Sequence, residues 1–310
     1  MEQVIASSLN EYIDAVLSFK LNPDETIFFR GEPDDFQETA FQPSIYRNSI
    51  IKNEHKLYRD IQRFNDAEFS SDRSTLDRLS RMQHYRTPTR LTDLSEDALT
   101  ALFFALLHEA DAKNIKPIVY VVAIKNDEIK YYDSDAVSVV SNLAKSPIIN
   151  NDNIYKSKTT LARDALKAIE DKEVNPFQSF NEKESVKYLL HDIKEDKGYF
   201  EGKVNPNHIF SIFCVKPKLS NSRLNGQKGA FLVYGLNKSD ITKSPSFIKR
   251  VGNYCFLDEI KSINHPVARI KKITIGDRIN ISDINKLGIT MPYIYTGLEK
   301  IADHFKKIYG

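Results

Sequence analysis

The sequence predicts a single α+β domain with a helical decoration, and three observations support this fold class. Segments with helical periodicity and segments rich in β-forming residues both occur along the chain. No internal repeat or low-complexity linker divides it. With 310 residues and 41% hydrophobic content, the chain can bury a substantial core. We expect one domain over residues 1–310, with a mainly helical insertion at about 141–198 and a C-terminal strand and helix extension at about 246–310.

Apolar residues at helical spacing predict the helices. The segments are roughly 3–19, 53–67, 98–107, 282–288 and 294–308, together with most of 141–198. Residues 98–107 are apolar on every side, which is typical of a helix inside the core. We expect Ser95 to cap this helix, and Ser282 and Gly288 to bound the short helix near the end.

Runs of β-branched and aromatic residues predict the strands. They are 26–32 (TIFFRGE), 116–124, 208–215, 229–235 and 269–273. The run at 116–124 (KPIVYVVAI) is apolar on both faces, so we expect a central strand there.

Charge and hydropathy exclude several classes of protein. Lys and Arg total 44 against 42 for Asp and Glu, so the net charge of +2 gives no global attraction to nucleic acid or membranes. No apolar run approaches the about 20 residues that span a bilayer. The N-terminus lacks the basic region and the long apolar core of a signal peptide. We therefore expect a cytoplasmic protein with no membrane partner.

The cysteines and glycines exclude some common sites. Cys214 and Cys255 are isolated in apolar runs, which is typical of buried packing residues. The spacing of Cys and His residues indicates no metal site. The chain has neither a GxxxxGK[ST] nor a GxGxxG phosphate-binding motif.

Arg30 is the first candidate for a functional residue. It ends the apolar part of the strand predicted at 26–32, and Gly31 leaves open backbone beside it. A guanidinium in this position can make bidentate contacts with phosphate or ribose oxygens. A surface arginine paired with Glu32 is the alternative interpretation.

A polar cluster directly before the 98–107 helix is the second candidate. Its members lie in residues 82–98 (MQHYRTPTRLTDLSEDA) and are His84, Tyr85, Arg86, Thr87, Thr89, Arg90, Thr92, Asp93 and Ser95. Polar groups at a helix N-terminus form a natural anion site, because free N–H groups and the helix dipole favour negative charge. Single members have structural alternatives, such as a cap at Asp93 or Ser95 and a hydrogen-bonded core histidine at His84. The cluster as a whole favours a binding site.

A turn before the strand at 229–235 is the third candidate. Arg223 and Gln227 lie directly before this strand, and Gly226 and Gly229 permit a tight turn or a close backbone approach. A hairpin turn with solvated polar residues is the alternative interpretation.

These three segments together resemble the FRG domain family, which is named for a Phe-Arg-Gly motif. That motif is residues 29–31 here, and residues 83–95 (QHYRTPTRLTDLS) resemble the strongest signature of the family. The resemblance also includes Pro43, Ser44, Arg47, Glu54, Arg223, Gln227, Gly229 and Phe231, and it covers nearly the whole chain. Arg86 stands where the family commonly has Gly, and Thr92 stands where it often has Leu.

The resemblance implies an ADP-ribosyltransferase-like fold, with a split, mostly antiparallel sheet and flanking helices. It implies NAD as a substrate held in the cleft of that sheet, and an RNA or protein acceptor. Such proteins resemble toxins of bacterial antiphage or toxin–antitoxin systems, so an antitoxin is a further expected partner. The residues implied in catalysis are Arg30, Asp93 and Gln227, and those implied in NAD binding are Phe29, Gly31, His84, Tyr85, Thr89, Arg90, Ser95 and Arg223.

The catalytic carboxylate is the open point of this resemblance. Gln227 cannot supply the negative charge that stabilises a ribosyl cation. Asp93, Glu32 or Glu54 would have to supply it, although Glu54 lies on the charged 53–67 segment and is expected to be solvated. Otherwise the domain is a non-catalytic nucleotide or nucleic-acid binding module, or a partner-binding scaffold. These interpretations differ in whether Arg30, Asp93 and Gln227 converge on one pocket.

Overall fold

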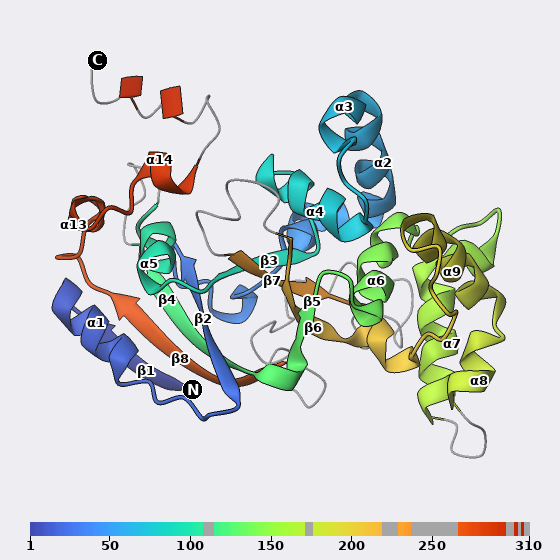
Figure 1. Ribbon diagram of the computed structural model, residues 1–310, viewed down its shortest axis with the longest axis horizontal. Coiled ribbons are helices and arrows are strands. Elements are labelled where there is room, and N and C mark those ends of the chain that lie inside the picture. The colour runs from blue at the N-terminus through green and yellow to red at the C-terminus, as the bar shows by residue number, and fades with distance from the viewer. Residues whose placement is uncertain are drawn as a thin grey trace.

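Eight strands form one sheet through the middle of the molecule (Figure 1). The computed structural model describes residues 1–107, 115–170, 176–218, 229–236, 266–295, 301–302 and 305–306. The strands are β1 (Glu2–Ala6), β2 (Glu25–Glu32), β3 (Leu91–Ser95), β4 (Ile118–Lys125), β5 (Ile129–Tyr131), β6 (Ile212–Lys216), β7 (Gly229–Tyr234) and β8 (Val267–Ile275). Their order in the sheet is β1-β8-β4-β2-β3-β7-β6-β5.

The strand directions confirm the α+β class with a mostly antiparallel sheet. β1 pairs with β8 in parallel, β5 pairs with β6 in parallel, and all the other neighbours are antiparallel. β4 is buried along seven of its eight residues, which confirms the central strand expected at 116–124.

Helices occupy both ends of the sheet. They are α1 (Leu9–Leu17), α2 (Glu54–Phe64), α3 (Asp66–Phe69), α4 (Thr75–His84), α5 (Ala98–Leu106), α6 (Asp135–Asn142), α7 (Lys158–Glu170), α8 (Pro176–Asn181), α9 (Glu184–Asp196), α13 (Ile281–Lys286) and α14 (Met291–Ile294). Three 3-10 helices matter below, η2 (Ser44–Asn53), η4 (Leu143–Lys145) and η6 (Pro206–Phe210).

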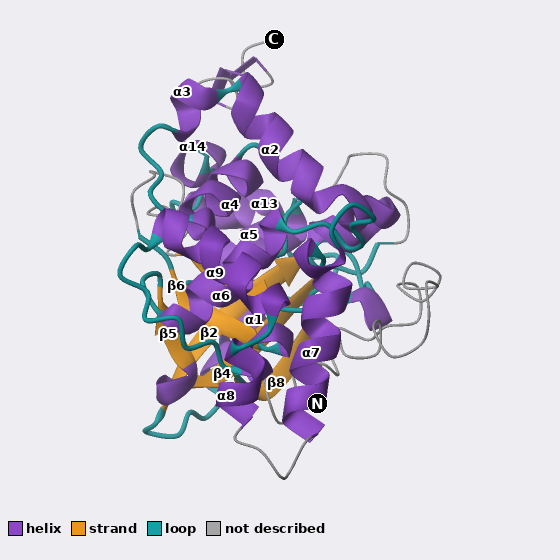
Figure 2. Ribbon diagram, turned by 90° about the vertical axis from the view of Figure 1, so that its right-hand side faces the viewer, coloured by secondary structure: helices purple, strands orange, loops and turns teal. Residues whose placement is uncertain are grey.

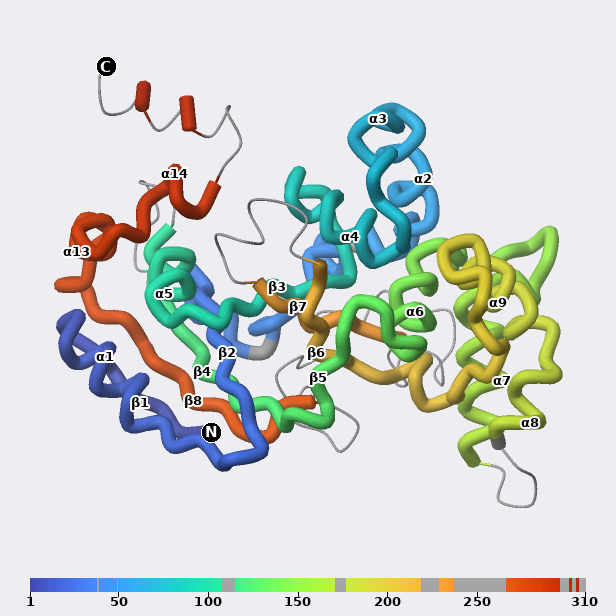
Figure 3. The backbone as a smooth tube through the Cα atoms, viewed as in Figure 1, coloured from blue at the N-terminus to red at the C-terminus, as the bar shows by residue number. Residues whose placement is uncertain are grey.

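Two groups of helices cover different strands. α1, α5, α13 and α14 gather at the β1-β8-β4-β2 end, where Phe29, Phe103 and Ile273 share one apolar core (Figure 1). α4, α6, α7, α8 and α9 pack with β3, β6 and β7 at the other end (Figures 1 and 3). Figure 2 shows the helices lying over the strands when the molecule is turned.

A third apolar core lies on the opposite face of β2 and β4. The segment between β2 and α2 covers it, with Phe41 and Ile45 packed against Phe28 and Tyr120. Since the third core also contains Tyr234 of β7, this covering segment spans both halves of the sheet.

The pairing within the sheet is interrupted between β2 and β3. β2 is paired with β4 along its whole length, from Glu25 to Glu32. Its pairing with β3 is restricted to one residue pair, Phe29 opposite Ser95. The residues of β2 after Phe29 therefore lie beside β3 without a strand ladder between them.

Several predicted element ends are wrong for tertiary reasons. The first helix begins at Leu9 and not at residue 3, because Glu2–Ala6 form β1 along β8. Ser95 ends β3, and Asp97 caps α5 instead by accepting from Leu99 N. The predicted strand at 208–215 begins only at Ile212, after η6.

The C-terminal part confirms some expectations and leaves others open. α13 is the predicted short helix, but Asn280 caps it and not Ser282. Gly288 ends it with a φ of +90°, which favours glycine. Residues 141–198 are mainly helical where described, whereas 246–265 and most of the predicted final helix lie outside the described residues. Among the described residues, none of the helices has the length and apolar character to cross a membrane.

Gly31 is required for the contact between β2 and α5. A β-carbon at this position would lie 1.8 Å from Ala101 O and 2.7 Å from Ala105 N. Only glycine lets the α5 backbone approach so closely, so the glycine of the Phe-Arg-Gly motif serves helix packing on this face.

Arg86 occupies a position that favours glycine. It follows α4 with a φ of +61°, and its N–H and that of Thr87 donate to Gln83 O and Met82 O. This is the left-handed conformation that commonly ends a helix. The family's glycine at this position therefore has a backbone reason.

We expect Arg86→Gly to stabilise the protein. The exposed side chain contributes little, and relief of the left-handed strain should raise the free energy of unfolding by about 0.5–1 kcal/mol. Chemical denaturation measures this change. Arg63→Gly, at an exposed position inside α2, is the control and should destabilise by about 1 kcal/mol. A loss of stability in Arg86→Gly would contradict a strained, left-handed backbone at this position.

Candidate functional site

The Arg30 guanidinium lies where β2 and β3 part. Its Nε donates to Glu32 Oε1 at 2.7 Å, and its Nη1 donates to the Asp93 carbonyl at 3.0 Å. The guanidinium thus bridges two strands that have no ladder here. Burial acts to lower the pKa of Arg30, but the charge of Glu32 and its hydrogen bond outweigh burial and raise it. With 16% of its side chain exposed, Arg30 remains within reach of a ligand.

Glu32 is the carboxylate beside Arg30. Arg30 and Glu32 are two residues apart on β2, so their side chains leave the same face of the strand. Glu32 is 2% exposed, and its Oε1 also accepts from Phe41 N at 3.0 Å. Its Oε2 is buried, with no hydrogen-bond partner among the described residues. A buried carboxylate oxygen of this kind can accept a donor from a ligand.

A second guanidinium acts on the same carboxylate. Arg47 lies on η2, and its pKa is lowered by partial burial and by the positive charge of Arg30, against the opposing effect of Glu32. The charge of Asp93 also acts on Arg30, so the two arginines and the two carboxylates of this group balance in charge. Each guanidinium can still contact an anionic group of a ligand directly.

The Asp93 side chain has a different partner from Arg30. Gln83 Nε2 donates to Asp93 Oδ1 at 2.7 Å, and Thr89 Oγ1 donates to Gln83 Oε1 at 2.6 Å. Because Phe29 lies opposite Ser95, Asp93 shares the α5 face of the sheet with Ser95, whereas Arg30 faces the third core. Arg30 therefore makes its direct contact with the Asp93 backbone, and the Asp93 carboxylate acts on it only through its charge.

Arg90 belongs to a buried group of charges and not to a ligand wall. It is 1% exposed, and Glu54 accepts from its Nε at 2.9 Å and also from its Nη2. Its Nη1 donates to Tyr234 O at 2.7 Å. Lys158 Nζ of α7 donates to the same Glu54 carboxylate. The expectation of a solvated Glu54 is wrong, since only 3% of it is exposed.

The remaining predicted residues lie mostly in the structural framework. Phe29 and Thr89 are buried, and Ser95 Oγ accepts from Asp97 N at 3.0 Å. Tyr85 is 55% exposed and donates to Glu68, with the His84 ring 5.0 Å away. Arg223 and Gln227 lie outside the described residues, so their place at the site stays a prediction.

Sequence reasoning named Glu32 as one of three candidate acids and missed Phe41. The spacing of two residues between Arg30 and Glu32 on one strand was the signal that could have singled out Glu32. Phe41 gave no signal, because its contact with Glu32 depends on how the chain turns after β2.

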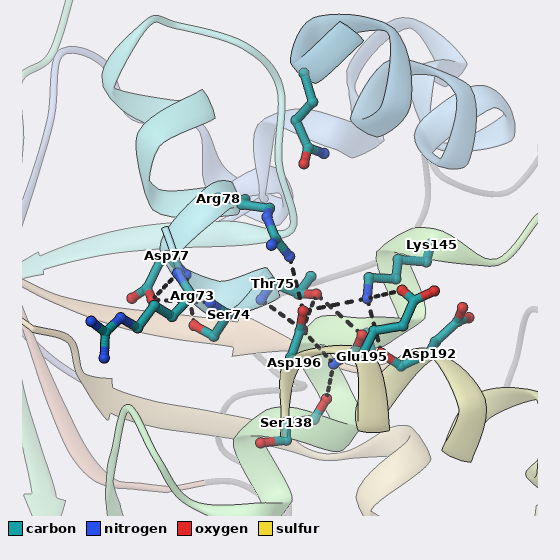
Figure 4. A network of polar contacts seen from close by, with 12 residues as sticks. Arg73, Ser74, Thr75, Asp77, Arg78, Ser138, Lys145, Asp192, Glu195 and Asp196 are labelled. Atoms are coloured by element: carbon teal, nitrogen blue, oxygen red, sulfur yellow. Dashed lines mark hydrogen bonds and ion pairs between the residues drawn. The ribbon is translucent and has the colours of Figure 1, made fainter. Parts of the chain in front are cut away.

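A polar network holds α4, which carries Gln83, against α9 (Figure 4). The Asp196 carboxylate accepts from Thr75 N at 2.8 Å and from Arg78 Nη1 at 2.8 Å, and Lys145 Nζ lies 3.5 Å from it. Burial acts to raise the pKa of Asp196, but these partners outweigh burial and lower it. The network fixes the helical end of the molecule relative to the Gln83–Asp93 contact.

Two cavities lie at this helical end. One of about 1090 Å³ lies beside α2 and α9, with Arg59, Lys156 and Asp192 among its lining residues. Another of about 380 Å³ lies beside the network of Figure 4, with Thr75 and Asn142 in its wall. Neither is lined by Arg30 or Glu32.

We expect substitutions of the buried charges around Glu54 to lower the free energy of unfolding by different amounts. Glu54→Gln leaves Arg90 and Lys158 without a counter-charge and should lower the free energy of unfolding by roughly 3–5 kcal/mol. Lys158→Met leaves a neutral Arg90–Glu54 pair and should cost less than about 1 kcal/mol. Chemical denaturation compares the two variants, with Asp72→Asn at the partly exposed Arg81 pair as the control. Equal costs for Glu54→Gln and Lys158→Met would contradict this account.

Lys158 should also make stability depend on pH. Burial and the charge of Arg90 lower its pKa from the usual 10.5 to about 8, against the opposing effect of Glu54. Between these values the unfolded chain binds more protons than the folded one, so the free energy of unfolding should rise with pH from about 8 to about 10.5. The rise should disappear in Lys158→Met, and a rise of equal size in this variant would rule out Lys158 as its source.

Comparison with known proteins identifies the segment that holds this site. The family model of the FRG domain matches residues 25–114, which include Arg30, Glu32, Phe41 and Asp93. No curated protein and no solved structure matches the chain. The chain therefore carries an FRG domain, which spans residues 25–114.

Proposed function

We propose that this FRG domain binds NAD where β2 and β3 part and transfers ADP-ribose from it to an RNA or protein acceptor. The observation that carries the proposal is the buried Glu32 Oε2, which has no hydrogen-bond partner among the described residues and lies on a carboxylate bound by Arg30. A hydroxyl group of a ribose is a donor that this oxygen can accept. The partly exposed Arg30 and the nearby Arg47 suit the diphosphate of a dinucleotide.

The proposed chemistry needs one carboxylate. When the bond between the ribose and nicotinamide breaks, nicotinamide leaves as a neutral molecule and positive charge develops on the ribose. Glu32 would stabilise that charge, and an acceptor nucleophile would attack the same carbon and lose its proton. Glu32 is favoured over Asp93, whose carboxylate is bound by Gln83, and over Glu54, whose charge is neutralised by Arg90 and Lys158.

A role as a bacterial antiphage or toxin–antitoxin effector is part of the same proposal. It would follow from ADP-ribosylation of an essential RNA or protein, and an antitoxin would then be a partner that blocks this activity. A non-catalytic nucleotide-binding module is the second candidate. One observation favours this second candidate. The catalytic residue implied near the end of the chain is Gln227, which is an amide and not an acid.

Calorimetry with NAD and an assay of released nicotinamide test the proposal. Glu32→Gln keeps an acceptor for Arg30 but removes the charge, so we expect nicotinamide release to fall about 100- to 1000-fold with a much smaller change in affinity. Arg30→Lys keeps the positive charge but cannot make a bidentate contact with the diphosphate of NAD. We therefore expect the affinity for NAD to fall about tenfold.

The Arg81–Asp72 pair supplies matched controls. This pair is similarly buried and has the same contact distance of 2.7 Å, although its contact is bidentate, and it joins α4 to the loop before it. Arg81→Lys and Asp72→Asn should therefore leave both readouts unchanged. NAD binding without nicotinamide release would favour the non-catalytic module. No binding and no release by the wild-type protein would overturn the proposal.

A further inference from the structure

Phe41 is a backbone outlier at the edge of the proposed site. Its φ is +65°, in the left-handed region that bulky side chains rarely adopt, and the residue is completely buried. Such a conformation persists only when the surrounding contacts impose it. The contacts that impose it here come from residues far away in the sequence.

Two hydroxyl groups hold the Phe41 carbonyl. Thr92 Oγ1 of β3 donates to Phe41 O at 3.0 Å, and the Tyr234 hydroxyl of β7 donates to the same oxygen at 3.1 Å. Both donors are buried. The Phe41 ring packs 4.9 Å from the Tyr120 ring, and the Arg30 guanidinium lies over it at 5.6 Å. Residues of four strands thus contact Phe41, and Thr92 of β3 and Tyr234 of β7 hold its carbonyl.

The Phe41 N–H faces the proposed catalytic carboxylate. It donates to Glu32 Oε1 at 3.0 Å, the same oxygen that accepts from Arg30 Nε. Oε1 therefore has two donors, while Oε2 of the same group has none among the described residues. A right-handed Phe41 would turn this N–H away, and of these two donors only Arg30 Nε would still hold the carboxylate.

We propose that Phe41 is a positioning residue for Glu32. Its left-handed peptide, held by Thr92 and Tyr234, fixes the carboxylate so that Oε1 is occupied and Oε2 is available to a hydroxyl group of the bound ribose. This inference rests on the proposed function for its ligand, but its geometric part concerns this chain alone.

The test removes the two hydroxyl groups that hold the Phe41 carbonyl without changing side-chain shape. The variants are Thr92→Val, Tyr234→Phe and their combination. Tyr12→Phe is the matched control, since Tyr12 is also a buried tyrosine whose hydroxyl donates to a backbone carbonyl, that of Ala98 at 2.7 Å in the α5 core. Hydrogen exchange of the Phe41 amide and the side-chain carboxyl resonance of Glu32 report positioning by NMR, and calorimetry with NAD reports binding.

We expect the double variant to exchange the Phe41 amide at least about tenfold faster, to shift the Glu32 carboxyl resonance, and to bind NAD about tenfold more weakly. Tyr12→Phe should lower the unfolding temperature as Tyr234→Phe does but leave all three readouts as in the wild type. An unchanged Glu32 resonance in the double variant, or equal losses of affinity in Tyr12→Phe, would overturn the inference.

The same experiment separates this inference from the proposed function. If wild-type protein binds NAD and Glu32→Gln abolishes nicotinamide release while the double variant behaves as the wild type, positioning by Phe41 is wrong and the function stands. If wild-type protein does not bind NAD, the function is wrong, and the NMR readouts alone decide whether Phe41 fixes Glu32.

Discussion

The buried carboxylate of Glu54 connects three parts of the molecule. It accepts from Arg90 at the start of β3 and from Lys158 of α7, so it joins α2, the sheet and the helical end of the molecule. Burying two cations and one acid costs a large desolvation free energy. Removal of the acid would leave both buried cations without a counter-charge. This group holds Arg90, directly before β3, while pairing with β7 holds the five residues of β3 itself.

β3 placed in this way leaves a gap beside β2 that Arg30 bridges. The strand pairing between β2 and β3 is limited to Phe29 and Ser95. Beyond this pair, the Arg30 guanidinium connects the strands by donating to the Asp93 carbonyl. Gly31 lets α5 pack against the other face of β2 at the same level. The Phe-Arg-Gly motif therefore combines two packing residues, Phe29 and Gly31, with one polar residue, and only Arg30 faces the proposed site.

Much of the fold could be predicted from local patterns. The apolar strands and the buried helix α5 could be predicted because the pattern of apolar residues reflects which faces are buried. The two apolar faces of β4 likewise predicted its central position. The strand at Glu2–Ala6 was not visible, since its conformation comes from pairing with β8 more than 260 residues later. Family resemblance located Arg30, and it also marked Arg86 as a position for glycine, which the left-handed backbone explains.

The roles of individual polar residues were harder to predict, because a role depends on tertiary partners. Arg90 and Glu54 each read as a surface or ligand-binding charge in the sequence, yet they neutralise one another in the interior. Glu32 was one acid among three, and its contacts with Arg30 and Phe41 and its buried Oε2 distinguish it.

A crystal structure of the protein with NAD would decide whether Glu32 lies at the ligand site. We expect the dinucleotide between β2 and β3, with a ribose hydroxyl within about 3.2 Å of Glu32 Oε2 and its diphosphate against Arg30 or Arg47. NAD bound instead in the cavity beside α2 and α9, or away from Glu32, would contradict this expectation.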